Sequence, residues 1–213
     1  MIRRVGKGIA LMKKDFRGSM FLALNLLFVN INRAVSTKIT YFLFFLKDIE
    51  IGKNNKFYGT PILQRVPRSN IIIGNNCRFR SDRTTGMAIR KKCIIRTYNA
   101  NASIEIGDNT GINGSVIASS DRIVIGKDVL IGYNCYISDT DNHPIDPTER
   151  HTGKAETAPI QIGDNVWLGA NVMVLKGISI GANSVIGANS LVLSNIPSNV
   201  IAIGNPCRVI KKI

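Results

Sequence analysis

The segment 139–144 (DTDNHP) concentrates side chains that could transfer a proton. The chain has two histidines, and His143 lies among these polar residues. A neutral imidazole can remove the proton of a weakly acidic hydroxyl while that oxygen attacks an electrophile. The other ring nitrogen then needs a partner that fixes the tautomer, and Asp139, Asp141 or a backbone carbonyl could serve. His143 is therefore a candidate catalytic base, with a hydrogen-bonded turn histidine as the alternative, and we expect His151 to be a surface residue.

A repeat of six residues defines the elements that must position this segment. From Ile162 onward an apolar residue recurs at every sixth position, and a glycine follows four of these anchors directly. The fifth position of each hexad is small or β-branched. The same frame recurs upstream of residue 140, more weakly before residue 80. The anchors from 162 onward are Ile162, Leu168, Val174, Ile180, Ile186 and Val192.

This period predicts a solenoid of short strands rather than an ordinary sheet. Three hexads complete one triangular coil, with the anchors pointing inward and stacked coils burying continuous apolar ladders. The glycine after each anchor is expected to relieve crowding and to permit unusual backbone angles at the corner. The fifth residue must be small because it is pressed against the equivalent residue of the next coil. Cys77 and Cys135 occupy this position, which predicts structural, buried thiols.

Two interruptions of the frame are candidate functional features. Between Ile112 and Ile125 the register slips by one residue, which predicts a loop or bulge near residues 119–122. Residues 138–159 form a polar stretch with prolines and charges, and a long excursion from a regular solenoid is a candidate functional loop. His143 would be the next anchor by counting. Because an imidazole fills a core poorly, we expect the chain to turn outward there.

Residues 1–47 lack hexads and predict one or two helices with basic and apolar clusters. No cluster reaches the roughly 18 to 20 apolar residues that cross a bilayer. Either the segment packs on the solenoid or on a neighbouring subunit, or it is a basic amphipathic anchor on a membrane surface. Residues 1–100 hold 20 Lys/Arg and 4 Asp/Glu, whereas residues 101–213 hold 8 and 10. The basic half carries no nucleic-acid-binding motif, so we expect no nucleic-acid partner.

The hexads, the histidine in an inter-coil loop, the VWLG segment at 166–169 and the NPCRVIKK tail at 205–212 together resemble the hexapeptide-repeat acyltransferases. The resemblance is greatest to the galactoside and maltose O-acetyltransferases and to enzymes that acetylate bacterial surface polysaccharides, and it covers about residues 104–213. It implies an all-β, left-handed parallel β-helix over residues 48–213, with residues 1–47 as a helical segment. It also implies direct acetyl transfer from acetyl-CoA to a sugar hydroxyl, with His143 as the catalytic base.

The resemblance further assigns roles to individual residues. Asn113, Asp121 and Trp167 would contact the acceptor substrate. The coenzyme would lie along backbone groups of Ala170 and Ala188, with the Ala170 amide as oxyanion donor. Arg208 and Lys211 would bind its phosphates, although Ser194 replaces a lysine that the family often has there.

The resemblance also implies a homotrimer with each active site between two subunits. No metal site is expected, because the related carbonic anhydrases need three histidines. With no signal peptide evident and four unpaired cysteines, we expect a cytoplasmic protein, in possible contact with the inner membrane surface through its basic half. Acceptors other than a polysaccharide (serine, an antibiotic or an amino sugar) and a non-catalytic scaffold remain alternatives.

Overall fold

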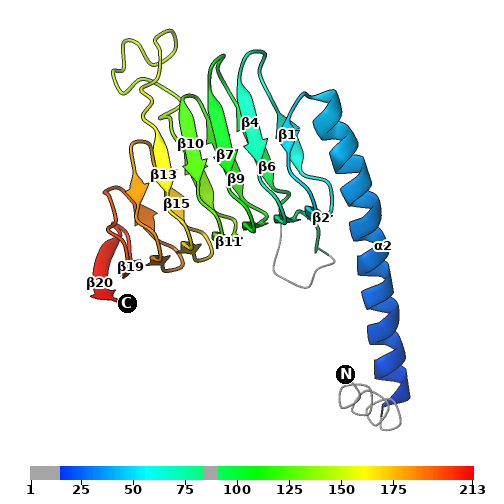
Figure 1. Cartoon of the computed structure of the whole chain (residues 1–213). Coiled ribbons are helices and arrows are strands. Elements are labelled where there is room, and N and C mark those ends of the chain that lie inside the picture. Colours follow the sequence, from blue (N-terminus) through cyan, green and yellow to red (C-terminus); the bar gives the residue numbers. More distant parts are fainter. Residues whose placement is uncertain (1–14, 84–90) are drawn as a thin grey trace.

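The protein is a parallel β-helix with three flat faces and a long N-terminal helix. The computed structural model describes residues 15–83 and 91–213. From the first strand to β15 (Met173–Val174), each strand pairs in parallel with the strand that lies three places further along the chain, and β17 (Val185–Ile186) pairs in parallel with β19 (Val200–Ile203). Figure 1 shows the resulting column of stacked coils, with helix α2 at one end and the C-terminus at the other.

The strands form three sheets, which we name A, B and C. Sheet A contains β1 (Glu50–Ile51), β4 (Asn70–Ile73), β7 (Ser103–Ile106), β10 (Arg122–Ile125), β13 (Ile160–Ile162) and β16 (Ser179–Ile180). Sheet B contains β2 (Lys56–Tyr58), β5 (Arg78–Arg80), β8 (Gly111–Asn113), β11 (Leu130–Tyr133), β14 (Trp167–Leu168), β17 (Val185–Ile186), β19 (Val200–Ile203) and the antiparallel β20 (Arg208–Lys212). Sheet C contains β3 (Ile62–Gln64), β6 (Ile94–Thr97), β9 (Val116–Ser119), β12 (Tyr136–Ser138), β15 (Met173–Val174) and β18 (Leu191–Val192).

The six-residue anchors fill the interior as the sequence predicts. In sheet A, Ile106, Ile125 and Ile162 lie in register on successive strands, and each is almost fully buried. The ladders of the other two sheets are also apolar, and in sheet B the first two coils contribute Phe57 and Phe79. The core is therefore one continuous apolar column, and each coil is stabilised by its neighbours.

The corners confirm one part of the glycine prediction and correct the other. A Cβ on Gly107 would lie 2.5 Å from the carbonyl carbon of Gly126, so these glycines do relieve crowding. They do not adopt left-handed backbone angles. Asparagines two residues further on do so instead, for example Asn109 at φ 61° and Asn165 at φ 55°. Asparagine tolerates this conformation better than most residues, because its short amide can hydrogen-bond locally.

Helix α2 (Phe16–Leu46) covers the open end of the first coil with its C-terminal third. Phe44 is buried against Phe57, whose ring stacks on Phe79 at a centroid distance of 4.8 Å. The backbone N–H of Phe57, at the edge of the sheet, donates to the Thr37 hydroxyl at 3.1 Å. The helix thus satisfies an edge strand that would otherwise be open to pairing with another chain.

The structure corrects the prediction about the apolar clusters of the N-terminal segment. They belong to one continuous helix of 31 residues, which by length and composition alone could cross a membrane. In the sequence, polar and basic residues separate the two clusters, and each cluster alone is too short to cross a membrane. Residues 1–14 lie outside the described part of the chain.

The corner packing gives the first testable prediction. We expect Gly107→Ala to lower the free energy of unfolding by about 1–3 kcal/mol, because the new methyl group would press on backbone atoms of Gly126 and Lys127 that cannot move independently. Gly111→Ala is the matched control. Its methyl group would meet only the flexible end of Leu130, at 3.3 Å. Denaturant unfolding of both variants tests this, and equal stability of the two would contradict it.

Candidate active site

The excursion predicted at residues 138–159 leaves the column after β12 and returns at β13, at the corner between sheets C and A. Its two ends pair with each other. Thr140 and Thr157 form an antiparallel bridge, and the Asp141 N–H donates to the Glu156 carbonyl at 3.2 Å. Figure 1 shows the excursion standing out from the edge of sheet A. This pairing makes a defined neck and leaves the rest of the excursion outside the core.

A buried carboxylate anchors the neck to the preceding coil. Asp139 is fully buried and accepts hydrogen bonds from the Ser119 hydroxyl at 2.7 Å and from the backbone N–H groups of Ser120 and Asp121 at 2.6 and 3.0 Å. These donors form the short connection between β9 and β10, where the sequence predicts a register slip. A carboxylate loses its hydrogen bonds to water when it is buried, so hydrogen bonds from the protein must replace them. The connection with the register slip supplies these donors and thereby provides the attachment site of the excursion.

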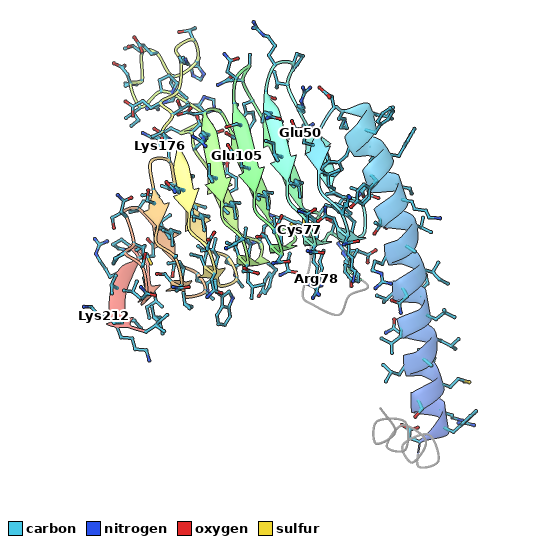
Figure 2. All side chains as sticks on the ribbon, in the orientation of Figure 1. Glu50, Cys77, Arg78, Glu105, Lys176 and Lys212 are labelled. Carbon is cyan, nitrogen blue, oxygen red and sulfur yellow. The ribbon has the colours of Figure 1, made fainter. Side chains whose placement is uncertain are left out.

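A half-buried ion-pair cluster holds the neck from the other side. The Lys176 ammonium lies 2.7 Å from a Glu156 carboxylate oxygen and 3.2 Å from one of Asp141. Figure 2 shows Lys176 directly below the base of the excursion. Hydrogen bonds to Glu156 and Asp141 raise the pKa of Lys176, and the same contact lowers the pKa of Glu156. The cluster therefore orients the neck.

His143 lies exposed on the excursion, as the sequence predicts. Its Nδ1 is 3.3 Å from the backbone carbonyl oxygen of Arg150. A carbonyl only accepts, so this hydrogen bond requires the proton to be on Nδ1 and leaves Nε2 with a free lone pair. Of the three partners that the sequence left open, the structure selects a backbone carbonyl. The carboxylate of Asp139 instead accepts from the β9–β10 connection, and that of Asp141 pairs with Lys176.

A hollow lies between the neck and the two preceding corners on the same side of the column. An aromatic ring, Tyr98, and several hydroxyl, amide and ammonium groups line it. Its residues are Tyr98, Asn99, Ser120, Thr140, Asn142, Lys154, Ala155 and Thr157. Asn142 is the neighbour of His143 in the chain, so the hollow adjoins the candidate base.

The residues predicted to contact the acceptor do not all lie beside His143. Asp121 does lie at the same corner, and its backbone N–H bonds to Asp139. Asn113 and Trp167 belong to β8 and β14 of sheet B, which the full width of sheet C separates from the excursion. Trp167 is 54% exposed. One chain alone therefore does not bring the predicted residues together.

The residues predicted to bind the coenzyme lie on that same distant side. Ala170 and Ala188 occupy equivalent corners between sheets B and C on successive coils, and the carbonyl of Ala170 accepts from Asn189 at 2.9 Å. Among residues 15–83 and 91–213, no acceptor meets the N–H of Ala170 or Ala188. Arg208 and Lys211 are exposed on β20. Free amides and nearby cations are suited to an anionic, hydrogen-bonding ligand.

The sites predicted from the sequence do not include Arg80, whose guanidinium lies beside Asn113. Arg80 donates to the Asn113 side-chain oxygen at 3.1 Å, and its guanidinium lies 5.3 Å from the centre of the Tyr58 ring. The Asn113 amide in turn donates to the Ile131 carbonyl at 3.0 Å. Tyr58, Arg80 and Asn113 are in register on adjacent strands. Extending the hexad frame through the anchors Phe79 and Ile112 would have revealed this row.

The cysteines are structural, as predicted for Cys77 and Cys135. Burial raises the pKa of the Cys77 thiol to about 11 and also raises the pKa values of Cys93 and Cys135. The Cys135 thiol donates to the Gly169 carbonyl at 3.1 Å, which requires its proton. These thiols are poor nucleophiles at neutral pH.

Comparison with known proteins agrees with this architecture. Residues 159–194 match the family model of the bacterial transferase hexapeptide (six repeats), and residues 122–138 match the hexapeptide repeat of succinyl-transferase. A Saccharomyces cerevisiae protein named as an acetyltransferase is 48% identical over 113 residues, which cover 53% of this chain and 57% of that protein. The galactoside O-acetyltransferase of Escherichia coli is 43% identical over 117 residues, with 54% and 57% covered.

Among solved structures, the hexapeptide-repeat acetyltransferase of Vibrio cholerae O1 biovar eltor complexed with acetyl coenzyme A is similar, with a TM-score of 0.51 and 34% identity over 55% of this chain and 64% of that one. The chain thus carries the bacterial transferase hexapeptide repeat and folds as a left-handed parallel β-helix. It spans less than two thirds of the length of these relatives, 57% of each of the two curated proteins. Its similarity is to acetyltransferases, and its own activity is inferred below.

The neck gives the second testable prediction. Asp139→Asn presents N–H groups to a site that already holds three donors. We expect the free energy of unfolding to fall by about 1–3 kcal/mol. Asp128→Asn is the control, since Asp128 is exposed at a left-handed corner where asparagine is suited. Chemical denaturation of both variants measures the difference; if the two variants are equally stable, the anchoring role is wrong.

Proposed function

We propose that this chain is an acetyl-CoA-dependent O-acetyltransferase whose acceptor is a sugar hydroxyl, in a bacterial surface polysaccharide or its precursor. The observation that carries the proposal is the 3.3 Å contact between Nδ1 of His143 and the backbone carbonyl oxygen of Arg150. A hydrogen bond from Nδ1 to the Arg150 carbonyl leaves Nε2 as a base on an exposed loop. The similarity to acetyltransferases supports the acyl donor.

The reaction is a direct transfer. Nε2 removes the proton of the acceptor hydroxyl as that oxygen attacks the thioester carbonyl carbon. The negative charge that develops on the carbonyl oxygen is stabilised by an amide donor, for which the free N–H of Ala170 is suited. The intermediate then expels the coenzyme thiolate, and the imidazolium returns its proton to the sulfur. The products are the acetyl ester and free coenzyme A, and His143 is again neutral.

A homotrimer completes this site. Because His143 and Asp121 lie at one edge of sheet C and Asn113, Trp167 and Ala170 lie beyond the other, a neighbouring subunit must supply one of the two sets. The acceptor lies against the hollow that Tyr98 lines, since an aromatic ring with surrounding polar groups is suited to a sugar. Asn113 retains one N–H for the acceptor after its bond to Ile131. Arg208 and Lys211 bind the coenzyme phosphates.

Replacement of the base separates the enzyme from a scaffold that binds no coenzyme. We expect His143→Ala to lower turnover by roughly 10² to 10⁴ without changing the coenzyme A dissociation constant. His151→Ala is the control, because His151 is exposed on the same excursion without a role in the reaction. Steady-state acetyl transfer to an oligosaccharide acceptor and calorimetric coenzyme binding give the two quantities. Full activity in His143→Ala, or no coenzyme binding by the unmodified protein, would refute the proposal.

A further inference from the structure

Within residues 15–83 and 91–213, no contact of the N-terminal half of α2 accounts for its composition. The buried residues of the helix are Ser36, Thr40 and Phe44, all in its C-terminal third. Figure 1 shows the N-terminal half projecting well beyond the column. In a single chain its large apolar side chains are exposed to solvent: Phe16, Met20, Phe21, Leu22, Leu24, Leu26, Leu27, Phe28 and Ile31.

These apolar side chains surround the helix instead of forming one stripe. Successive helix residues point about 100° apart, so Phe21, Leu22 and Leu27 face three different sides. They are 76%, 59% and 57% exposed. A helix that packs against one partner helix or one protein groove needs a single apolar stripe and keeps its other face polar. An environment that is apolar on all sides matches this surface better, and a lipid bilayer is such an environment.

The charges around this segment match an anionic membrane surface. Residues 18–32 contain no charged side chain, and Arg17 and Arg33 lie at the two ends. The whole helix contains Arg17, Arg33 and Lys38 but no Asp or Glu. Residues 1–14 add five Lys/Arg to the sequence. Basic residues beside an apolar segment are attracted to anionic headgroups, and their long side chains can reach the interface from within the bilayer.

The length of the segment indicates how it enters the bilayer. Fifteen residues (18–32) span about 22 Å as a helix, which is shorter than the hydrocarbon core of about 30 Å. With basic residues at both ends, the segment is suited to embedding in one leaflet of the bilayer instead of crossing both. It is not amphipathic, so it differs from the surface anchor that the sequence suggested.

We propose that the N-terminal half of α2 inserts into a lipid bilayer that carries anionic headgroups and so anchors the β-helix at the membrane surface. The C-terminal third of the helix is fixed to the first coil through Phe44 and the Thr37 hydroxyl. The proposed anchor is therefore attached directly to the first coil of the column. This inference does not depend on acetyl transfer.

Vesicle flotation of the full chain tests the anchor. We expect the protein to float with vesicles of phosphatidylcholine mixed with phosphatidylglycerol, and less with phosphatidylcholine alone. The variant Phe21→Gln/Leu22→Gln/Leu27→Gln should lose roughly tenfold or more of the bound fraction, while glutamine keeps the helix. Arg17→Gln/Lys38→Gln should reduce the preference for the anionic vesicles.

The matched control moves the same kind of substitution off the helix. Ile62, Leu193 and Ile213 are 41%, 48% and 67% exposed, and their replacement by glutamine should leave flotation unchanged. Light scattering gives the oligomeric state of every variant. The proposal fails if the unmodified protein stays at the bottom of the gradient with both vesicle types, or if the helix variant floats as well as the control. A protein that does not float, with a helix variant that dissociates, would show that another copy of the chain covers α2.

Discussion

The close stacking of successive coils is the constraint on which the rest of this structure depends. At the most crowded corners a coil can lie on its neighbour because the residue there has no Cβ, as at Gly107, Gly126 and Gly169. The interior anchors then fall into register, and each adds its apolar surface to one column. The turn angles come from asparagines, whose side chains also bond from coil to coil, as in the series Asn134, Asn171 and Asn189. The same six-residue spacing thus places glycines at the corners, where they allow the coils to stack, and apolar anchors in the interior, where they are buried.

This regularity explains why the excursion can carry chemistry. The column holds the neck at two points. The β9–β10 connection donates hydrogen bonds to Asp139, and Lys176 on the opposite side pairs with Asp141. The interaction of Lys176 with the exposed Glu156 contributes little to stability, because water screens it. Its effect is to fix the direction of the neck. Asp139 has the larger structural effect, because its carboxylate is buried and cannot exchange its protein donors for water.

The sequence predicts the column well because a six-residue period is a strictly local signal. The anchors, the small fifth positions, the register slip and the outward turn before His143 follow from counting alone. The partner of His143 does not, because the Arg150 carbonyl belongs to an irregular loop whose path no periodicity describes. Arg80 escaped for another reason: its row is visible only when strands 33 residues apart are aligned. The sequence predicts one or two helices in the N-terminal segment and the structure has one, but its continuous length does not follow from the two separate apolar clusters.

The central claim is that the column holds His143 at one edge and the coenzyme-binding corner at the other, so two copies must meet to make one site. Co-expression of His143→Ala with Ala170→Trp, a bulky block at the coenzyme corner, tests it directly once each variant is shown to be inactive by itself. In randomly mixed trimers, a site that takes these residues from different subunits is intact in about one quarter of cases. Acetyl transfer should therefore return to about a quarter of the unmodified level. If both residues serve the same site from one chain, every site keeps a lesion, and the mixture stays inactive.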